Sequence, residues 1–415
     1  MNIIVASSGG PTCAINASIA GVWREASECP AVGKVYGALN GIEGIMQERI
    51  IDLADVLKSD ADVELLKKTP ASILGSCRCK LPPSDSLEIG NRIYDDILAV
   101  LNKYKIEVLL YIGGNDSMDT VSKLSAYLER NNSGISVIGI PKTIDNDLPE
   151  TDHTPGFGSA ARYLVTTIRE IARDSMVYNC NSVTIIEVMG RDTGWLAASA
   201  CVLNKLGDGF PHLIYLPETP FSYERFLADI QEKQRRHKAV IALVSEGVKT
   251  DGGTYAAADR QSGKQDIFGH SYLSGIGKLL EELVGERLNC KVRSVELNVL
   301  QRCSAHLASD TDIAEAELVG EEAFAAGLDG HSGVMVVLLR CPFGPKGSYS
   351  VYAGRADVDL VANKIKYFPK EWINPAGNHV TGEAAEYFMP LIGDINTLPE
   401  HLTLDKRLQK IVTGV

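Results

Sequence analysis

Short runs of β-branched and other apolar residues alternate with longer stretches of helical periodicity through most of the chain. This alternation is typical of parallel sheets covered by helices. The predicted strands lie at residues 3–6, 108–112, 137–140, 183–188, 213–216, 240–244, 292–297 and 334–339, and helices are predicted over 14–25, 118–128 and 196–202. The pattern indicates the α/β class, with two doubly wound α/β domains, a site in the cleft between them and a C-terminal extension.

The domain boundaries are inferred from this pattern, since no Pro/Ser-rich linker, low-complexity segment or fixed-period repeat interrupts the middle of the chain. We expect an N-terminal α/β domain over residues 1–150 and a second α/β domain over 151–340, with the chain free to cross between them. Residues 341–415 change character and are expected to form an extension or cap. Several Pro and Gly there accompany Tyr349, Tyr352, Tyr367, Phe368 and Trp372.

Composition narrows the class of protein. Of 415 residues, 45% are hydrophobic and 23% charged, which is the mix of a globular protein. The formal net charge is -12 and no dense Lys/Arg block is present, so no nucleic acid is expected as a partner. Nine cysteines without a CxxC pair indicate reduced thiols and a cytoplasmic location rather than a structural zinc site. No signal-peptide pattern and no apolar run of roughly 18 residues is present, so no membrane association is expected.

A glycine pair follows the first predicted strand. Gly9 and Gly10 lie between this strand and a predicted helix. Glycines at such a turn let backbone N–H groups approach a phosphate at the start of the helix. A tight strand-to-helix turn without any ligand explains them equally well.

A second glycine pair, Gly113 and Gly114, follows the strand at 108–112 and leads into Asn115, Asp116 and Ser117. An amide, a carboxylate and a hydroxyl at one strand end suit a site for metal and phosphate. The alternative is that Asp116 or Ser117 only caps the following helix.

The segment 141–147 is the most informative, because it ends a predicted strand with Lys142, Thr143, Asp145 and Asp147. Phosphoryl transfer to an alcohol needs a carboxylate that accepts the hydroxyl proton, cations that offset developing charge, and usually Mg²⁺ on the phosphate oxygens. In an extended backbone Asp145 and Asp147 would share a face, so one could serve the hydroxyl and the other the metal. A cluster of Asx turns on a solvated loop is the competing interpretation.

Other candidates are spread along the chain, and each by itself is better explained as a solvated charge or a polar strand end. Arg191 follows the strand at 183–188 and can meet a sugar phosphate, whereas Glu246 follows the strand at 240–244 and can hold sugar hydroxyls. Further cations are Arg78, Lys80, Arg293 and Arg302.

Taken together, these motifs resemble the phosphofructokinase family, in order from Gly9 to about Gly327 and more weakly in the tail. The matching residues are Gly9-Gly10, Gly113-Gly114, 143–147, Met189-Gly190-Arg191, Glu246 and Gln301-Arg302. The resemblance implies phosphorylation of the 1-hydroxyl of fructose 6-phosphate to fructose 1,6-bisphosphate, in glycolysis or gluconeogenesis. The N-terminal domain would then carry the diphosphate and metal loops, and the second domain would bind the sugar phosphate.

The resemblance also implies roles for single residues, with Asp145 as the catalytic base. Gly9, Gly10, Arg78 and Lys80 would bind the diphosphate. The sugar phosphate would be held by Thr143, Met189, Gly190, Arg191, Glu246, Arg293 and Arg302. In this family the counterpart of Arg293 reaches the site of a neighbouring subunit, which implies a homodimer or homotetramer.

Asp116 and Lys142 indicate pyrophosphate rather than ATP as the donor and are predicted to act in catalysis with Asp145. The pyrophosphate-dependent branch resembles this chain at both positions, whereas ATP-using relatives carry glycine. A carboxylate about 4 Å from the α-phosphate of ATP would cost on the order of 4 kcal/mol at an effective dielectric near 20. Lys142 can neutralise charge on the leaving phosphate. The reaction would be reversible, since the bonds broken and formed are similar in energy.

Mg²⁺ is the expected cofactor, with Asn115 and Asp147 as its expected ligands. Asn115 departs from the family, which usually has a metal-coordinating aspartate there, so Asp116, Asp147 or bound water could also hold the ion. Ser182 replaces an arginine of ATP-using bacterial relatives, and Val299 replaces a polar or aromatic contact. Affinity or specificity for the sugar phosphate can therefore differ.

Three alternative functions stay open. One is an ATP-dependent 6-phosphofructokinase. Another is an NAD or lipid kinase, which shares glycine-rich metal loops but does not explain Met189-Gly190-Arg191 or Gln301-Arg302. The third is a non-catalytic regulatory subunit that binds sugar phosphate, which would have no need of a base at Asp145.

Overall fold

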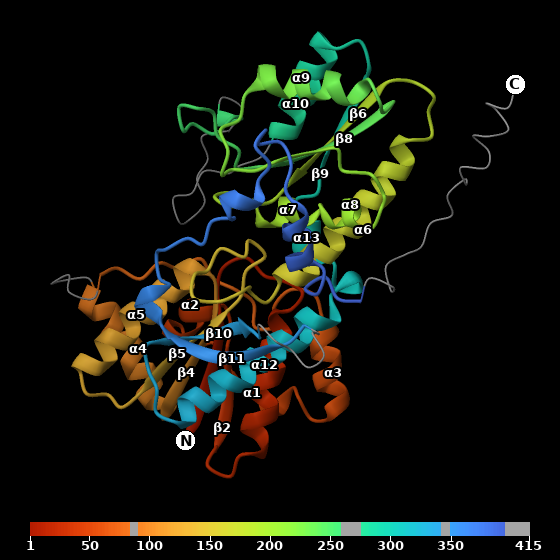
Figure 1. Cartoon of the computed structure of the whole chain (residues 1–415). Helices are drawn as coiled ribbons and strands as arrows, with labels where there is room; N and C mark the ends of the chain where they lie inside the picture. The colour runs from red at the N-terminus through yellow and green to blue at the C-terminus, as the bar shows by residue number, and fades with distance from the viewer. Residues whose placement is uncertain (84–89, 259–274, 342–348, 395–415) are drawn as a thin grey trace, which may run out of the picture.

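The chain forms two β-sheets, and helices cover both faces of each (Figure 1). In this view the smaller sheet is at the top and the larger sheet is at the bottom. The computed structural model describes residues 1–83, 90–258, 275–341 and 349–394. Side chains alternate across the sheets as expected for strands. In the first strand Ile3 and Val5 pack against the helices on one face, and Ile4 and Ala6 pack against those on the other.

The larger sheet has seven strands in the order β11-β10-β5-β4-β1-β2-β3. All run parallel except β3 and β11, which pair antiparallel at the two edges. The strands are β1 (Asn2–Ser7), β2 (Lys34–Ala38), β3 (Ile50–Asp52), β4 (Ile106–Gly113), β5 (Ser136–Pro141), β10 (Val334–Arg340) and β11 (Val351–Asp357). One face is covered by α1 (Ile15–Glu28), α3 (Asp60–Lys68) and α12 (Asp310–Leu328), and the other by α2 (Gly41–Met46), α4 (Gly90–Lys103) and α5 (Asn115–Arg130).

The smaller sheet has four parallel strands in the order β7-β8-β6-β9. The strands are β6 (Ser182–Val188), β7 (Leu213–Tyr215), β8 (Ala239–Ser245) and β9 (Lys291–Glu296). One face is covered by α6 (Phe157–Ser175), α7 (Trp195–Ser199), α8 (Val202–Lys205) and α13 (Gly382–Phe388), and the other by α9 (Tyr223–Gln234) and α10 (Ile276–Arg287). The short helix α11 (Leu300–Cys303) follows β9.

The α/β prediction is confirmed, since both sheets are largely parallel and covered on both faces. Every predicted strand forms. The helix predicted over 196–202 is instead two short helices, α7 and α8. The strands β2 and β11 escaped prediction because Gly37 and Gly354 interrupt their apolar runs, and β3 was missed because it has only 3 residues.

The chain returns from the smaller to the larger sheet before residue 340, a crossing that the prediction had left open. The helix α12 packs closely on α1, where a Cβ at Gly320 would lie 2.1 Å from the carbonyl oxygen of Ser18. Glycine at this position therefore permits the crossing, and β10 then extends the larger sheet.

Residues 349–394 of the predicted extension or cap pack on both sheets. The strand β11 pairs with β10, which covers the backbone hydrogen-bonding groups of that edge, and α13 packs on the smaller sheet. Residues 395–415 of the predicted extension lie outside the described residues.

Two further properties follow from the coordinates. All nine cysteines are unpaired thiols, as the sequence predicted. Among the helices of the described ranges, none is both long and apolar enough to cross a bilayer.

Candidate active site

A cavity of about 410 Å³ lies where strand ends of the two sheets meet. Its walls come from the segments that follow β1, β4 and β5 of the larger sheet and β6 and β8 of the smaller one. Ligands bind at this edge of parallel sheets because loops and helix N-termini converge there. The predicted site residues that line the cavity are Gly9, Gly10, Arg78, Asn115, Asp116, Lys142, Thr143, Asp145, Asp147, Met189, Arg191, Glu246 and Arg302.

Three predicted residues do not line the cavity. Lys80 lies beside it, with its Nζ 3.8 Å from a carboxylate oxygen of Asp116. Gly190 supports the wall, since its N–H donates to Glu246 Oε1 at 3.5 Å. Arg293 lies on the edge strand β9 and pairs with Asp174 at 2.7 Å, so this chain does not bring it to its own cavity.

The first glycine loop is shaped by two cations beneath and beside it. Gly9 has a φ of +80°, which favours glycine, and a Cβ at Gly10 would lie 2.8 Å from Nη1 of Arg302. Lys142 reaches across from the end of β5 and donates to the carbonyl oxygens of Ser8 at 3.0 Å and Gly10 at 2.7 Å. The loop is therefore held close to positive charge.

Lys142 and Arg302 have no ion-pair partner among the described residues. Burial, together with the charge of Arg302, lowers the pKa of Lys142 to about 8. Burial and the nearby charge of Arg78 likewise lower the pKa of Arg302. Within the ranges that the structure describes, neither Arg191 nor Arg302 forms an ion pair. A polyanionic ligand would relieve this repulsion, which is the property expected of a diphosphate site.

Three carboxylates of the cavity, those of Asp145, Asp147 and Glu246, have raised pKa values. Burial raises the pKa of Asp145, and burial together with the charge of Asp145 raises the pKa of Asp147 to about 7. Burial and the charge of Asp145 raise the pKa of Glu246 to about 8. No side chain in the described part of the chain forms an ion pair with Asp145 or Asp147. Perturbed carboxylates beside unpaired cations in a cavity mark a catalytic site rather than a structural ion pair.

The turn that presents Asp145 and Asp147 differs from the extended backbone that was expected. Asn146 between them has a φ of +53°, in the left-handed region. The Asp145 N–H donates to Thr143 Oγ1 at 3.1 Å, so a hydroxyl closes the start of the turn. Both carboxylates still line the cavity, which contradicts the interpretation of this segment as a solvated loop.

Neither Asp116 nor Ser117 caps the helix that follows β4. Gly114 is the N-cap residue of α5, without a side-chain capping bond, and Ser117 Oγ lies 2.5 Å from Ser8 Oγ. Asp116 stands in the first turn of α5 and lines the cavity. The capping interpretation is therefore wrong for both residues.

Asn115 is engaged by a distant part of the chain. Its Oδ1 accepts the N–H of Asn363 at 2.6 Å, and its amide nitrogen donates to the carbonyl oxygen of Lys364. The predicted metal ligand thus fastens the segment around residue 364 to the second glycine loop.

Asp145 and Asp147 are carboxylates of the cavity that could hold a metal ion. The described residues include no group of three or more His, Cys, Asp and Glu arranged around a metal ion. Mg²⁺, however, is usually held by one or two carboxylates together with phosphate oxygens of the substrate. Burial and the negative charge of Asp145 raise the pKa of Asp147, and a divalent ion would compensate that charge, so this pair fits an ion that arrives with a phosphate ligand.

The cavity also contains residues that the sequence prediction missed. Asp192 and Thr193 extend the polar run after β6, and this continuation was a usable signal. Asn363 and Ile365 come from a segment that follows β11 and carries no glycine pair or strand-end motif, so no local pattern pointed to them.

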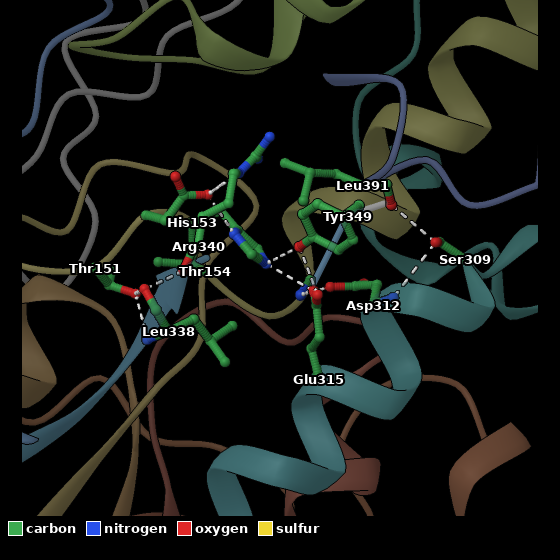
Figure 2. A network of polar contacts seen from close by, with 12 residues as sticks. Thr151, His153, Thr154, Ser309, Asp312, Glu315, Leu338, Arg340, Tyr349 and Leu391 are labelled. Carbon is green, nitrogen blue, oxygen red and sulfur yellow. Dashed lines mark hydrogen bonds and ion pairs between the residues drawn. The ribbon is translucent and has the colours of Figure 1, made fainter. Parts of the chain in front are cut away.

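A paired polar network lies just beyond the turn. His153 is 2.6 Å from Glu315, and Tyr349 donates to the other oxygen of Glu315 at 2.6 Å (Figure 2). Nδ1 of His153 is 2.8 Å from Asp152, which also pairs with Arg340 at 3.0 Å. This cluster joins the loop after β5 to α12 and β10.

These features are those of an α/β enzyme whose strand ends enclose cations and buried carboxylates in one cavity. The family model "Phosphofructokinase" matches residues 2–326, and the chain belongs to this family.

Relatives extend this similarity over most of the chain. The pyrophosphate–fructose 6-phosphate 1-phosphotransferase of Xanthomonas campestris pv. campestris is 39% identical over 393 residues, which are 94% of this chain and 91% of that protein. The protein of the same name from Halomonas elongata is 36% identical over 394 residues, with the same two shares covered. The crystal structure of a pyrophosphate-dependent phosphofructokinase from Marinobacter aquaeolei matches with a TM-score of 0.82 at 33% identity, over 97% of this chain and 98% of that one.

Proposed function

We propose that this protein transfers a phosphoryl group from pyrophosphate to the 1-hydroxyl of fructose 6-phosphate, giving fructose 1,6-bisphosphate and phosphate in a reversible reaction. The observation that carries this proposal is the carboxylate of Asp145, which has no ion-pair partner among the described residues and lines the same cavity as the cations Lys142 and Arg302. Relatives that cover most of this chain bear the name of this reaction.

In the proposed reaction Asp145 accepts the proton of the sugar 1-hydroxyl. The hydroxyl oxygen forms a bond to phosphorus while the bridging bond of pyrophosphate breaks, and the leaving phosphate takes the electron pair. Lys142, beneath the Gly9-Gly10 loop, offsets the charge that builds up on the leaving phosphate. A ligand phosphate close to Lys142 also favours its charged form, against the lowered pKa of the empty site.

The sugar phosphate is proposed to bind on the wall formed by the smaller sheet. Arg191 provides an unpaired guanidinium for the phosphate, and Glu246 provides a carboxylate for the sugar hydroxyls. Met189 completes this wall, and Thr143 is proposed to contribute from the segment after β5 of the larger sheet. Arg302, beside Gly10, is proposed to lie between the two ligands.

Mg²⁺ is proposed as the metal ion, held by Asp147 with Asp145 nearby, where it would supply charge compensation for the phosphate oxygens. We also propose a homodimer or homotetramer, because Arg293 lies outside its own cavity on the edge strand of the smaller sheet. Unpaired thiols at all nine cysteines support a cytoplasmic location.

The test is the initial velocity with fructose 6-phosphate and Mg²⁺, measured with either pyrophosphate or ATP as the only donor. We expect turnover with pyrophosphate and none with ATP. Turnover with ATP alone would keep Asp145 as the base and overturn the donor assignment. Activity with neither donor would support a regulatory subunit that binds sugar phosphate.

Asp116 is tested in the same assay by Asp116→Gly. Removing a carboxylate near the α-phosphate is expected to improve ATP binding by up to about a thousandfold, because like charges at about 4 Å repel by on the order of 4 kcal/mol. Lys80→Ala, which removes only the neighbour of Asp116, is the control and should leave ATP excluded. An unchanged donor preference in Asp116→Gly would remove Asp116 from the specificity argument.

A further inference from the structure

The segment 363–366 joins parts of the site that are far apart in sequence. The N–H of Asn363 binds Asn115 at the start of α5, and the N–H of Lys366 donates to the carbonyl oxygen of Asp147 at 2.8 Å. On the other side, Trp195 Nε1 donates to the carbonyl oxygen of Lys366 at 2.9 Å. The segment is thus bonded to the metal and phosphate loop, the catalytic turn and the smaller sheet at once.

The ammonium group of Lys366 is directed at the loop after β5. Its Nζ donates to Asn146 Oδ1 at 3.3 Å and to the carbonyl oxygens of Thr151 at 3.1 Å and Asp152 at 2.8 Å. It also lies 5.0 Å from the ring centroid of Trp195. A lysine ammonium has three donors, and all three have an acceptor here.

The turn that Lys366 contacts requires external support. Asn146 has a φ of +53°, a conformation that persists only where surrounding contacts determine it. Its side chain is held at both ends by the C-terminal part of the chain, because Oδ1 accepts from Lys366 and Nδ2 donates to Tyr387 Oη at 3.1 Å. Asp145 and Asp147 flank this residue, so the conformation of Asn146 sets the direction of both carboxylates.

We propose that Lys366 is a positioning residue for phosphoryl transfer, which fixes the left-handed turn at Asn146 so that Asp145 and Asp147 face the cavity together. Lys366 does not line the cavity, so it acts through the turn rather than on the substrate. The proposal rests on the proposed function only for the role of Asp145 as the base.

The first test compares Lys366→Met with Lys67→Met in steady-state kinetics and thermal unfolding. Lys67 is a matched control, because its Nζ pairs with Glu317 of α12 at 2.8 Å and with Glu64 of its own helix α3 at 3.1 Å, and it does not line the cavity. In Lys366→Met we expect kcat to fall by about tenfold to a hundredfold with each KM changed less than about threefold, since a misplaced catalytic group slows chemistry without removing a substrate contact. In Lys67→Met kcat should stay within about twofold of wild type at a similar loss of stability. A kcat of Lys366→Met within twofold of wild type would overturn the proposal.

If Lys366→Met does not fold, a second variant, Tyr387→Phe, tests the same turn. It removes one hydroxyl, which accepts from Asn146 and donates to the carbonyl oxygen of Asp152 at 2.7 Å. A fall in kcat of about threefold to tenfold with unchanged KM is expected, because half of the support of Asn146 is lost. Wild-type kcat in this variant would contradict the role assigned to the turn.

Amide hydrogen exchange tests the role of Lys366 independently of the proposed function. Exchange at residues 143–148 is expected to be faster in Lys366→Met than in Lys67→Met, whether or not the protein uses pyrophosphate. If the wild type does not turn over pyrophosphate, the proposed function fails, and the exchange data still decide whether Lys366 holds the turn. Equal exchange in the two variants would overturn the proposal.

Discussion

Two clusters of charged side chains follow β5 within a few residues of each other, and they differ in how their charges are balanced. In the first, Asp145 and Asp147 line the cavity without an ion pair in the described chain, and their pKa values are raised. In the second, Asp152 and His153 form a paired network with Glu315 (Figure 2). The same loop thus carries two carboxylates without an ion pair in the described chain and, a few residues later, a network of ion-paired side chains.

The pKa shifts of the second cluster favour the charged forms, whereas those of Asp145 and Asp147 favour the neutral forms. Burial opposes the charged forms, but the hydrogen bonds with Asp152 and Glu315 outweigh it and raise the pKa of His153. Burial would likewise raise the pKa of Asp152, but the hydrogen bond from His153 and the charge of Arg340 lower it. Breaking a buried charge pair that the protein itself compensates destabilises the fold. Carboxylates in a cavity with perturbed pKa values are instead candidates for a functional site.

The largest expected effect comes from comparing one aspartate of each cluster, Asp145 and Asp152. Asp145→Asn should lower kcat by about 10² to 10⁴, the usual contribution of a general base, and leave stability unchanged or higher because an uncompensated charge is removed. Asp152→Asn should do the reverse, with kcat nearly retained and stability reduced. Steady-state kinetics and chemical unfolding of both variants provide the measurement. Retained turnover in Asp145→Asn would remove it from the role of base.

A second prediction concerns the network alone. Glu315→Gln leaves His153 and Tyr349 with a weaker acceptor in a buried site, and breaking such a cluster should destabilise the protein by about 3 kcal/mol. Glu322→Gln on the same helix α12 is the control. It weakens the more exposed pair with Arg355, which should cost less than about 1 kcal/mol. Equal losses in urea unfolding would show that the network is no more than a surface pair.

The smallest effect is a pH dependence of stability. Because the folded-state pKa of His153 lies above its ordinary value of 6.5, the stability contributed by its protonated form is fully present below pH 6.5 and is lost as the pH rises through the raised pKa. The lowered pKa of Asp152 acts at the other end, with a contribution present above its ordinary value of 3.8 and lost at lower pH.

The measurement for this pH prediction is unfolding of the wild type and His153→Gln between pH 5 and pH 9. The difference in unfolding free energy should decrease by on the order of 1.5 kcal/mol as the pH rises, which is what a hydrogen bond to a charged group contributes. A difference that is constant across this range would contradict a protonated His153.

Much of the fold and part of the site could be predicted from local patterns. Strand runs such as 183–188 were recognisable because buried parallel strands are almost continuously apolar, and polar residues directly after them marked the sheet edge. Lys142 and Asp145 were found in this way, at the end of β5. Asn115 shows the limit of that reasoning, since its bonds to residues 363 and 364 depend on contacts more than 200 positions away.

The amino-acid sequence by itself determined the class of fold, the strand ends and the chemical types of group that gather at the site, because these depend on residues that are close together in the chain. Only the tertiary structure decided that β10 and β11 return to the larger sheet, that Asn146 adopts a left-handed turn, and that Lys366 supports it. The physical reason is that a carboxylate's pKa and a turn's conformation depend on the charges and hydrogen bonds around them, and here those come from distant segments.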